Sequence, residues 1–122
     1  MPAQRGQATV EIALCLPLVA LLVGAVVETT AVAVDNVRLW HATREAARAA
    51  AVEPDSSVPR AIAGRVIDPV ELTIVPEPQA RVAGEPVVVS ATFVPDAQVP
   101  LIGALFERLR LHARVAMRIE VP

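Results

Sequence analysis

Few residues in this chain have the types and spacing that catalysis or metal binding requires. The sequence has one cysteine, Cys15, and two histidines, His41 and His112, which lie far apart along the chain. A single cysteine excludes an internal disulfide and a cysteine-based metal cluster. No paired carboxylates, Gly-rich phosphate loop or nucleophile motif accompany them, and the formal charge of −2 does not favour nucleic acid. We therefore expect no enzyme, no cofactor, no small-molecule substrate and no nucleic-acid partner.

A long apolar run near the N-terminus is the most informative feature. From Ile12 to Val27 the chain has no charged side chain, and with Glu28 and two threonines included the run extends to Val34. A helix of that length covers roughly 35 Å, enough for a hydrocarbon core of about 30 Å. A domain this small could not surround such a helix with protein, so we expect it to span a membrane. Pro17 inside the run lacks a backbone N–H, which predicts a kink.

The charges that flank the run predict its orientation. Arg5 and the terminal amine precede it, whereas Glu28 and Asp35 lie near its far end. Basic residues close to a spanning segment favour the cytoplasmic side, while those in a long exported tail carry little weight. We expect a single-pass protein with a cytoplasmic N-terminus and an exported C-terminal part.

A glycine and a carboxylate stand at the entrance of the run. Gly6 ends a short basic leader, and Glu11 lies five residues after it. Glycine leaves the backbone open to close approach by a protease. A carboxylate at the edge of a bilayer needs a cationic partner, and a new amine created by cleavage would supply one in this chain or in a neighbouring subunit. The simpler alternative is that Glu11 only caps the helix.

This entrance resembles the class III signal of type IV prepilins, in which a membrane peptidase cuts after the glycine on the cytoplasmic face. The resemblance implies cleavage between Gly6 and Gln7, with Glu11 as the fifth residue of the mature chain.

The wider arrangement resembles TadE-like minor pilins of tight-adherence (Flp-type) pilus systems. The shared features are Gly6, Glu11, the pair Leu16-Pro17 and an Ala-Arg-rich helix over 44–51, within roughly residues 5–53. Ile12 stands where the family often has an aromatic residue. The resemblance implies a minor pilin, or pseudopilin, that helps to assemble or prime the pilus. It also implies as partners the bilayer, other minor and major pilins, the prepilin peptidase and the assembly platform, and a place in the cell membrane or a surface pilus.

The rest of the chain predicts an α+β fold, with a long N-terminal helix followed by an antiparallel sheet of about three strands. We expect a leader over 1–6, a transmembrane helix over 7–35, its exported continuation over 36–52 and a small β-rich domain over 53–122. Five alanines between Ala46 and Ala51 give a surface on which a sheet or helix can pack closely.

The strands are predicted from alternation and β-propensity. Val70 to Ile74 and Val87 to Val94 have strand patterns, and the last segment alternates apolar and polar residues from Leu109 to Val121. Between them we expect one short turn over 59–64 and a short helix or apolar loop over 101–108. The arginine-rich face of the last strand is expected to be solvated.

Two other interpretations stay open. Ala31-Val32-Ala33 fits a signal peptidase motif, and cleavage after Ala33 would release a secreted binding domain. The chain could also be a single-pass anchored protein of unrelated function. Cys15 does not indicate a lipid attachment site, because Leu14 precedes it where a small residue is needed.

Overall fold

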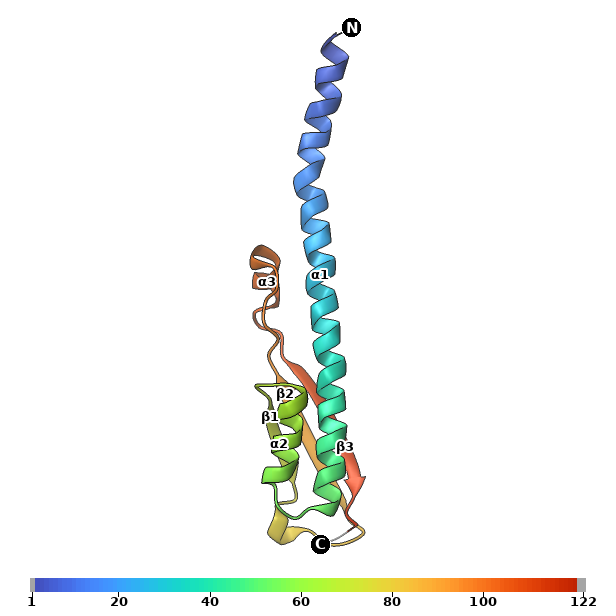
Figure 1. Ribbon diagram of the computed structural model, residues 1–122, viewed down its shortest axis with the longest axis vertical. Coiled ribbons are helices and arrows are strands. Elements are labelled where there is room, and N and C mark those ends of the chain that lie inside the picture. Colours follow the sequence, from blue (N-terminus) through green and yellow to red (C-terminus); the bar gives the residue numbers. More distant parts are fainter. Residues whose placement is uncertain (1, 121–122) are drawn as a thin grey trace. The chain divides into compact units, whose positions relative to one another are not determined.

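The computed structural model describes residues 2–120, with side chains from Gly6 onward; Met1 of the predicted leader and Val121 of the predicted last strand lie outside this range. The elements (Figure 1) are α1 (Pro2–Val52), α2 (Ser57–Val66), β1 (Glu71–Val75), the 3-10 turn η1 (Pro78–Ala80), β2 (Pro86–Phe93), α3 (Pro100–Phe106) and β3 (Leu111–Arg118). The strands form one antiparallel sheet in the order β1-β2-β3. The predicted α+β fold, with a long helix before a three-stranded sheet, is confirmed.

The chain divides into two compact units, and α1 contributes to both. One unit consists of residues 1–32 and 96–108, and the other of residues 33–95 and 109–122. The first contains the apolar part of α1 together with α3. The second contains the rest of α1, α2 and the sheet.

In the second unit, α1 packs on the sheet through a stripe of small side chains. Leu39 is fully buried, and five alanines follow it at helical spacing on the same side: Ala42, Ala46, Ala47, Ala50 and Ala51. These residues share one core cluster with the inward side chains of β2, which are Val87, Val89, Ala91 and Phe93. The predicted alanine surface is therefore confirmed, although Ala49 lies only half-buried beside it.

Helix α2 is longer than the single turn predicted over 59–64. It runs from Ser57 to Val66 and contributes Pro59 and Ala63 to the buried interior. The prediction took Gly64 as the end of the turn, but here Gly64 lies inside the helix. Glycine costs a helix only about 1 kcal/mol, and burial of the neighbouring apolar side chains offsets that cost.

The alternation of the last segment correctly predicts its two faces. Along β3, the side chains of Leu111, Ala113, Val115 and Met117 are buried or half-buried. His112, Arg114 and Arg118 are exposed, as expected of a solvated face. The strand itself ends at Arg118, earlier than predicted, but Ile119 beyond it is still buried.

The C-terminal carbonyls of α1 are bound by a residue that the sequence analysis did not single out. Arg81 is 6% exposed, and its Nη1 donates to the carbonyls of Ala50 (3.2 Å) and Glu53 (2.9 Å). Its Nε donates to the carbonyl of Pro76 at 3.3 Å, and its Nη2 to the hydroxyl of Ser56 at 3.3 Å. The last carbonyls of a helix have no partner within the helix, and its C-terminus favours a positive charge. Arg81 therefore ties the end of α1 to the loop after β1.

Replacing Arg81 should destabilise the second unit. Hydrogen bonds from a charged donor contribute about 1.5–3 kcal/mol, so we expect Arg81→Gln to lower the free energy of unfolding by about that amount. Unfolding of the full chain in detergent can be followed through the fluorescence of Trp40, which packs against the core. Arg118→Gln on the exposed face is the matched control and should change stability little. Equal stability of the two variants would contradict the capping role of Arg81.

A carboxylate holds the start of α2 in a way that depends on pH. Asp55 Oδ1 accepts a hydrogen bond from the backbone N–H of Ser57 at 2.8 Å. This bond, with a further one from the Ser57 side chain, lowers the pKa of Asp55 below its ordinary value of 3.8. Because the folded pKa lies below the unfolded one, the contribution is complete above the unfolded pKa and is lost as the pH falls through the folded pKa.

Asp55→Asn should remove this part of the pH dependence, because asparagine can still accept the hydrogen bond but does not titrate. We expect the wild type to lose more thermal stability than Asp55→Asn between pH 6 and pH 2.5. Melting curves of both chains over this range provide the measurement. Parallel losses in the two chains would show that Asp55 does not stabilise α2 through its charge.

Candidate functional site: the apolar part of α1 and its entrance

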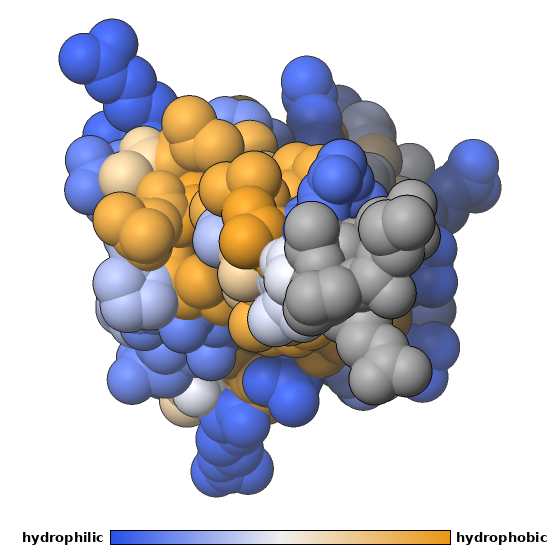
Figure 2. All heavy atoms as spheres, turned by 90° about the horizontal axis from the view of Figure 1, so that it is seen from above, coloured by the Kyte–Doolittle hydropathy of each residue, from blue (hydrophilic) through white to orange (hydrophobic). Residues whose placement is uncertain are grey.

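Helix α1 carries an exposed apolar surface long enough to cross a membrane. Within the described residues it is the one helix that meets this condition, and its most apolar stretch is not buried inside the protein. The large apolar side chains that are half or more exposed here are Val10, Ile12, Leu14, Leu16, Leu18, Val19, Leu21, Leu22, Val23 and Val26. Figure 2 shows a broad group of hydrophobic side chains on the face that it presents. Water would not favour such a surface, whereas lipid would.

The two threonines that follow this stretch satisfy their hydroxyl groups within the helix. Thr29 Oγ1 donates to the carbonyl of Ala25, and Thr30 Oγ1 to that of Val26, both at 2.8 Å. Because each threonine O–H group donates to a carbonyl of the preceding turn, it does not need a water molecule as its acceptor. Both threonines are therefore compatible with the edge of a bilayer.

The predicted cleavage residues lie on the first turns of α1. Gly6 is exposed, and a Cβ added there would meet no atom within 4 Å. Nothing in the described part of the fold therefore requires glycine at this position. The bond between Gly6 and Gln7 is helical, so a protease that binds an extended strand would have to unwind this end of α1.

Glu11 lies one turn after Gln7 on the same side of the helix. The Gln7 side-chain amide donates to Glu11 Oε1 at 3.3 Å, and the carboxylate is exposed. A neutral amide satisfies part of its hydrogen-bonding capacity but does not balance its charge. Residues four apart on a helix are neighbours, so an amine at Gln7 would lie close to this carboxylate.

Pro17 lies inside α1, which continues on both sides of it. Proline cannot donate to the carbonyl of Ala13, four residues before it, which weakens the helix locally. The predicted kink stays a prediction.

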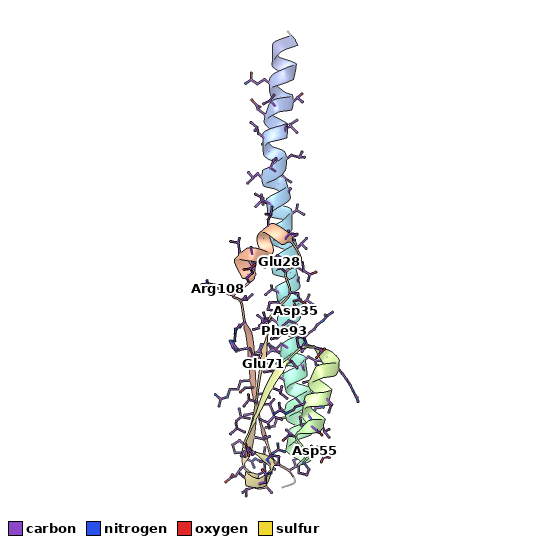
Figure 3. All side chains as sticks on the ribbon, turned by 90° about the vertical axis from the view of Figure 1, so that its left-hand side faces the viewer. Glu28, Asp35, Asp55, Glu71, Phe93 and Arg108 are labelled. Atoms are coloured by element: carbon purple, nitrogen blue, oxygen red, sulfur yellow. The ribbon has the colours of Figure 1, made fainter. Side chains whose placement is uncertain are left out.

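A second carboxylate, Glu28, connects α1 to the segment before α3. Glu28 is 1% exposed, and its Oε2 accepts hydrogen bonds from the backbone N–H groups of Gln98 and Val99, both at 2.9 Å. Its Oε1 is 3.3 Å from the same Gln98 nitrogen. Figure 3 shows Glu28 beside the beginning of α3. Two main-chain donors thus replace the water that this buried carboxylate would otherwise bind.

Helix α3 packs closely against α1 one turn before Glu28. Ile102 is 7% exposed, and a Cβ added to Gly24 would lie 2.6 Å from Ile102 Cδ1, so only glycine allows this approach without a shift. A shallow apolar groove continues from this contact along both helices, lined by Pro17, Ala20, Leu21, Val99, Pro100, Leu101 and Ile102.

Sequence reasoning missed the role of Glu28 and its contact with residues 96–108. It used Glu28 only as a flanking charge and expected a helix or apolar loop in the later segment. Two signals were available: a carboxylate at the end of an apolar run, and a second uncharged apolar segment after Pro100. The sequence does not show that the two meet, because Gln98 is far from Glu28 along the chain.

The residues that first suggested chemistry lie apart from one another and from Glu28. Cys15 is free and exposed on α1, His41 is exposed, and His112 Nδ1 lies 3.2 Å from the hydroxyl of Thr92 on the open face of the sheet. Between Pro2 and Glu120, no three His, Cys, Asp or Glu side chains come together in a group that could hold a metal ion.

Comparison with protein-family models gives one match, to the family described as TadE-like protein. Residues 6–48 are TadE-like. This range begins at Gly6, contains Glu11, Pro17 and Glu28, and ends within the alanine stripe of α1. The predicted resemblance is therefore confirmed over this part of the chain. No curated protein and no solved structure matches the chain.

The TadE-like match over residues 6–48 and the one long, exposed apolar helix among the described residues fit a protein that crosses a membrane once. The match ends before α2, so the sheet and α3 lie outside it.

Proposed function

We propose that this chain is a minor pilin, or pseudopilin, that helps to assemble or prime a tight-adherence pilus. The observation that carries the proposal is the position of the TadE-like match, which covers the apolar helix and its entrance, with Glu11 five residues after Gly6. In this proposal the helix holds the subunit in the cell membrane with its N-terminus in the cytoplasm. The sheet-bearing unit is exported and contacts other pilins.

Processing at the entrance is the first step of the proposed function. A prepilin peptidase would cut between Gly6 and Gln7 and remove the leader 1–6. Cleavage would leave an amine on Gln7 one helical turn before Glu11, where opposite charges attract. Glu11 would then be neutralised by this amine or by that of a neighbouring pilin, and either pairing lowers the cost of a carboxylate in lipid.

Replacing Gly6 tests the processing step without disturbing the fold. A side chain at this position meets no atom of the chain, so Gly6→Leu should fold and insert normally. We expect its leader to be retained, because the bulky side chain keeps the backbone away from the peptidase. Mass spectrometry of the membrane-bound chain from cells that contain the pilus system gives the N-terminus.

Gly64→Leu is the matched control, because a Cβ there also meets no atom within 4 Å. This variant should begin at Gln7, as the wild type is expected to. If Gly6→Leu also begins at Gln7, the assignment of the cleavage site is wrong. If the wild type begins at Val34, the secreted-domain interpretation replaces the pilin proposal.

Replacing Glu11 tests the assembly step. Glu11→Val makes the helix more apolar, so insertion should be unharmed, whereas co-purification of other pilins from solubilised membranes should fall strongly. Glu11→Gln removes only the charge and should behave like Glu11→Val if charge neutralisation holds the partners together. Leu14→Val, a neutral change at an exposed position of the same helix, is the control. Unchanged co-purification in Glu11→Val would reduce Glu11 to a capping residue.

The contact of Glu28 with Gln98 and Val99 favours the anchored protein over a secreted domain. Cleavage after Ala33 would remove Glu28 but leave residues 97–106 attached to the exported unit. The backbone N–H groups of Gln98 and Val99 would lose their acceptor, and Ile102 would lose its contact at Gly24. A released domain would therefore carry an exposed apolar loop, which promotes aggregation.

A further inference from the structure

The connection between β2 and β3 is much longer than the turn that two paired strands require. Phe93 at the end of β2 pairs with Leu111 at the beginning of β3, so residues 94–110 form one loop. Neighbouring antiparallel strands are usually joined by about two to five residues. Long loops in compact domains usually have a function of their own. This loop contains α3.

The middle of the loop has no charged residue. Residues 97–106 have the sequence AQVPLIGALF and lie between Asp96 on one side and Glu107 and Arg108 on the other. The one amide side chain, that of Gln98, donates to the carbonyl of Asp96 at 3.3 Å, at the charged end of the segment. An uncharged apolar segment between charged flanks is typical of an element that enters an apolar phase.

One face of α3 is left uncovered by its contact with α1. Leu101 is 80% exposed and Leu105 is 83% exposed, the highest values for large apolar side chains among the described residues. Residues four apart share a helix face, so the two leucines form one apolar surface. Removing both leucine side chains from water would be favourable.

The α1 residues beside α3 belong to the stretch expected to lie in lipid. The groove between the helices is lined from α1 by Pro17, Ala20 and Leu21, all within the uncharged run from Ile12 to Val27. Along the helix, Gly24 beside Ile102 is about 6 Å from Glu28 and Pro17, the furthest lining residue, is about 16 Å from it, close to the roughly 15 Å of hydrocarbon in one leaflet. An element that contacts this stretch lies at the same depth in the bilayer.

Glu28 satisfies part of the backbone of this loop, which lowers the cost of placing it in lipid. Irregular backbone is not tolerated in hydrocarbon unless protein satisfies its polar groups. Before α3, the N–H groups of Gln98 and Val99 donate to Glu28, and Pro100 has no N–H. The N–H of Gly103 donates to the carbonyl of Val99 at 2.6 Å. The N–H groups of Gln98 and Val99 thus have their acceptor on α1, and that of Gly103 has its acceptor within the loop.

We propose that residues 97–106 are a second membrane-embedded element, held by Glu28 in the leaflet that contains the C-terminal end of the span, with Leu101 and Leu105 in contact with lipid acyl chains. The proposal rests on the proposed insertion of α1 but not on pilus assembly. Lipid is the occupant because Leu101 of α3 lines the same groove as Leu21 of α1, which is 50% exposed, so the uncovered face of α3 adjoins the exposed apolar surface of α1. Neither the run from Ile12 to Val27 nor residues 97–106 contain a charged side chain that could direct a protein partner.

Depth-dependent fluorescence quenching in vesicles tests the proposal on the full chain. A Cys15→Ala background allows one cysteine at a time to be labelled with an environment-sensitive fluorophore: Leu105→Cys on α3, Leu21→Cys on α1 and Val82→Cys in an exposed loop. The chains are placed in phosphatidylcholine–phosphatidylglycerol vesicles at about one chain per vesicle. We expect nitroxides on the lipid acyl chains to quench the label at residue 105 as strongly as that at residue 21. Aqueous iodide should quench only the label at residue 82.

Variants of Glu28 then test the anchor. Glu28→Ala should make the label at residue 105 accessible to iodide and leave the label at residue 21 in lipid, because α1 only becomes more apolar. Glu28→Gln keeps one acceptor oxygen and should retain part of the lipid quenching at residue 105. If Glu28→Ala leaves the label at residue 105 in lipid, Glu28 does not hold the loop in the bilayer, and that part of the proposal is wrong.

The labels at residues 21 and 82 distinguish failure of the embedded loop from failure of the membrane insertion of α1. Iodide access at residue 105 with lipid quenching at residue 21 would overturn the embedded loop and leave membrane insertion of α1 intact. Iodide access at both positions would overturn both. If the label at residue 105 is protected only when many chains share a vesicle, a second protein chain covers α3, and lipid is the wrong occupant.

Discussion

The structure depends on a change of surface along one continuous helix. From Val10 to Val27, apolar side chains point out of α1 in many directions, and most of the large ones are more than half exposed. From Leu39 to Ala51, the buried side chains form a single stripe in which alanine predominates. Lipid solvates a helix from every side, whereas a sheet covers only one side and comes closest where the side chains are small. The rest of the chain is arranged according to these two surfaces.

Among residues 6–120, the two buried charged side chains, Glu28 and Arg81, are balanced mainly by main-chain groups. Glu28 accepts from two backbone N–H groups, whereas Arg81 donates to three carbonyls and one hydroxyl. Burying a charge without such partners would cost several kcal/mol of folding free energy. Each charged side chain therefore holds in place the segment whose main-chain groups it binds. Within residues 6–120, no buried side-chain nitrogen or oxygen is left without a hydrogen-bond partner. The two residues therefore position the loops before α3 and after β1.

The sequence predicted the features that repeat over many residues and missed those made by single residues. The apolar run, the alanine stripe and the alternation of β3 each repeat a pattern several times, so one exception such as Arg114 or His112 does not obscure them. Helix α2 was predicted too short because a single Gly64 was given more weight than the apolar spacing around it. Glu28 and Arg81 act through contacts with chain segments distant in the sequence. Neither contact leaves a periodic signal.

Gly6, at the entrance of α1, is a residue whose predicted importance the fold of the chain does not explain. Gly6 was predicted to matter because of a resemblance, and the fold offers no reason for glycine there, since a side chain would meet nothing. A residue that its own fold does not require is free to be selected by a partner, and the requirement then lies in that partner's binding site. Gly24 differs, because a Cβ added there would lie 2.6 Å from the Cδ1 end of the Ile102 side chain, which would have to shift. The two glycines look alike in the sequence and differ only in what surrounds them.

The position of α3 within the chain adds a mechanical consequence to the embedded loop. Phe93 and Leu111 are paired, so both ends of the loop leave the sheet at the same end of the β2–β3 hairpin. If residues 97–106 lie in the bilayer, the sheet-bearing unit is joined to the membrane by three chain crossings: α1 and the two arms of the loop. A single helical connection allows rotation about its axis, whereas additional attachments restrict the orientations that the exported unit can adopt. For the pilin subunit proposed above, this restriction would lower the entropy lost on docking with a neighbour. The long β2–β3 loop would then serve assembly by limiting motion before any partner is bound.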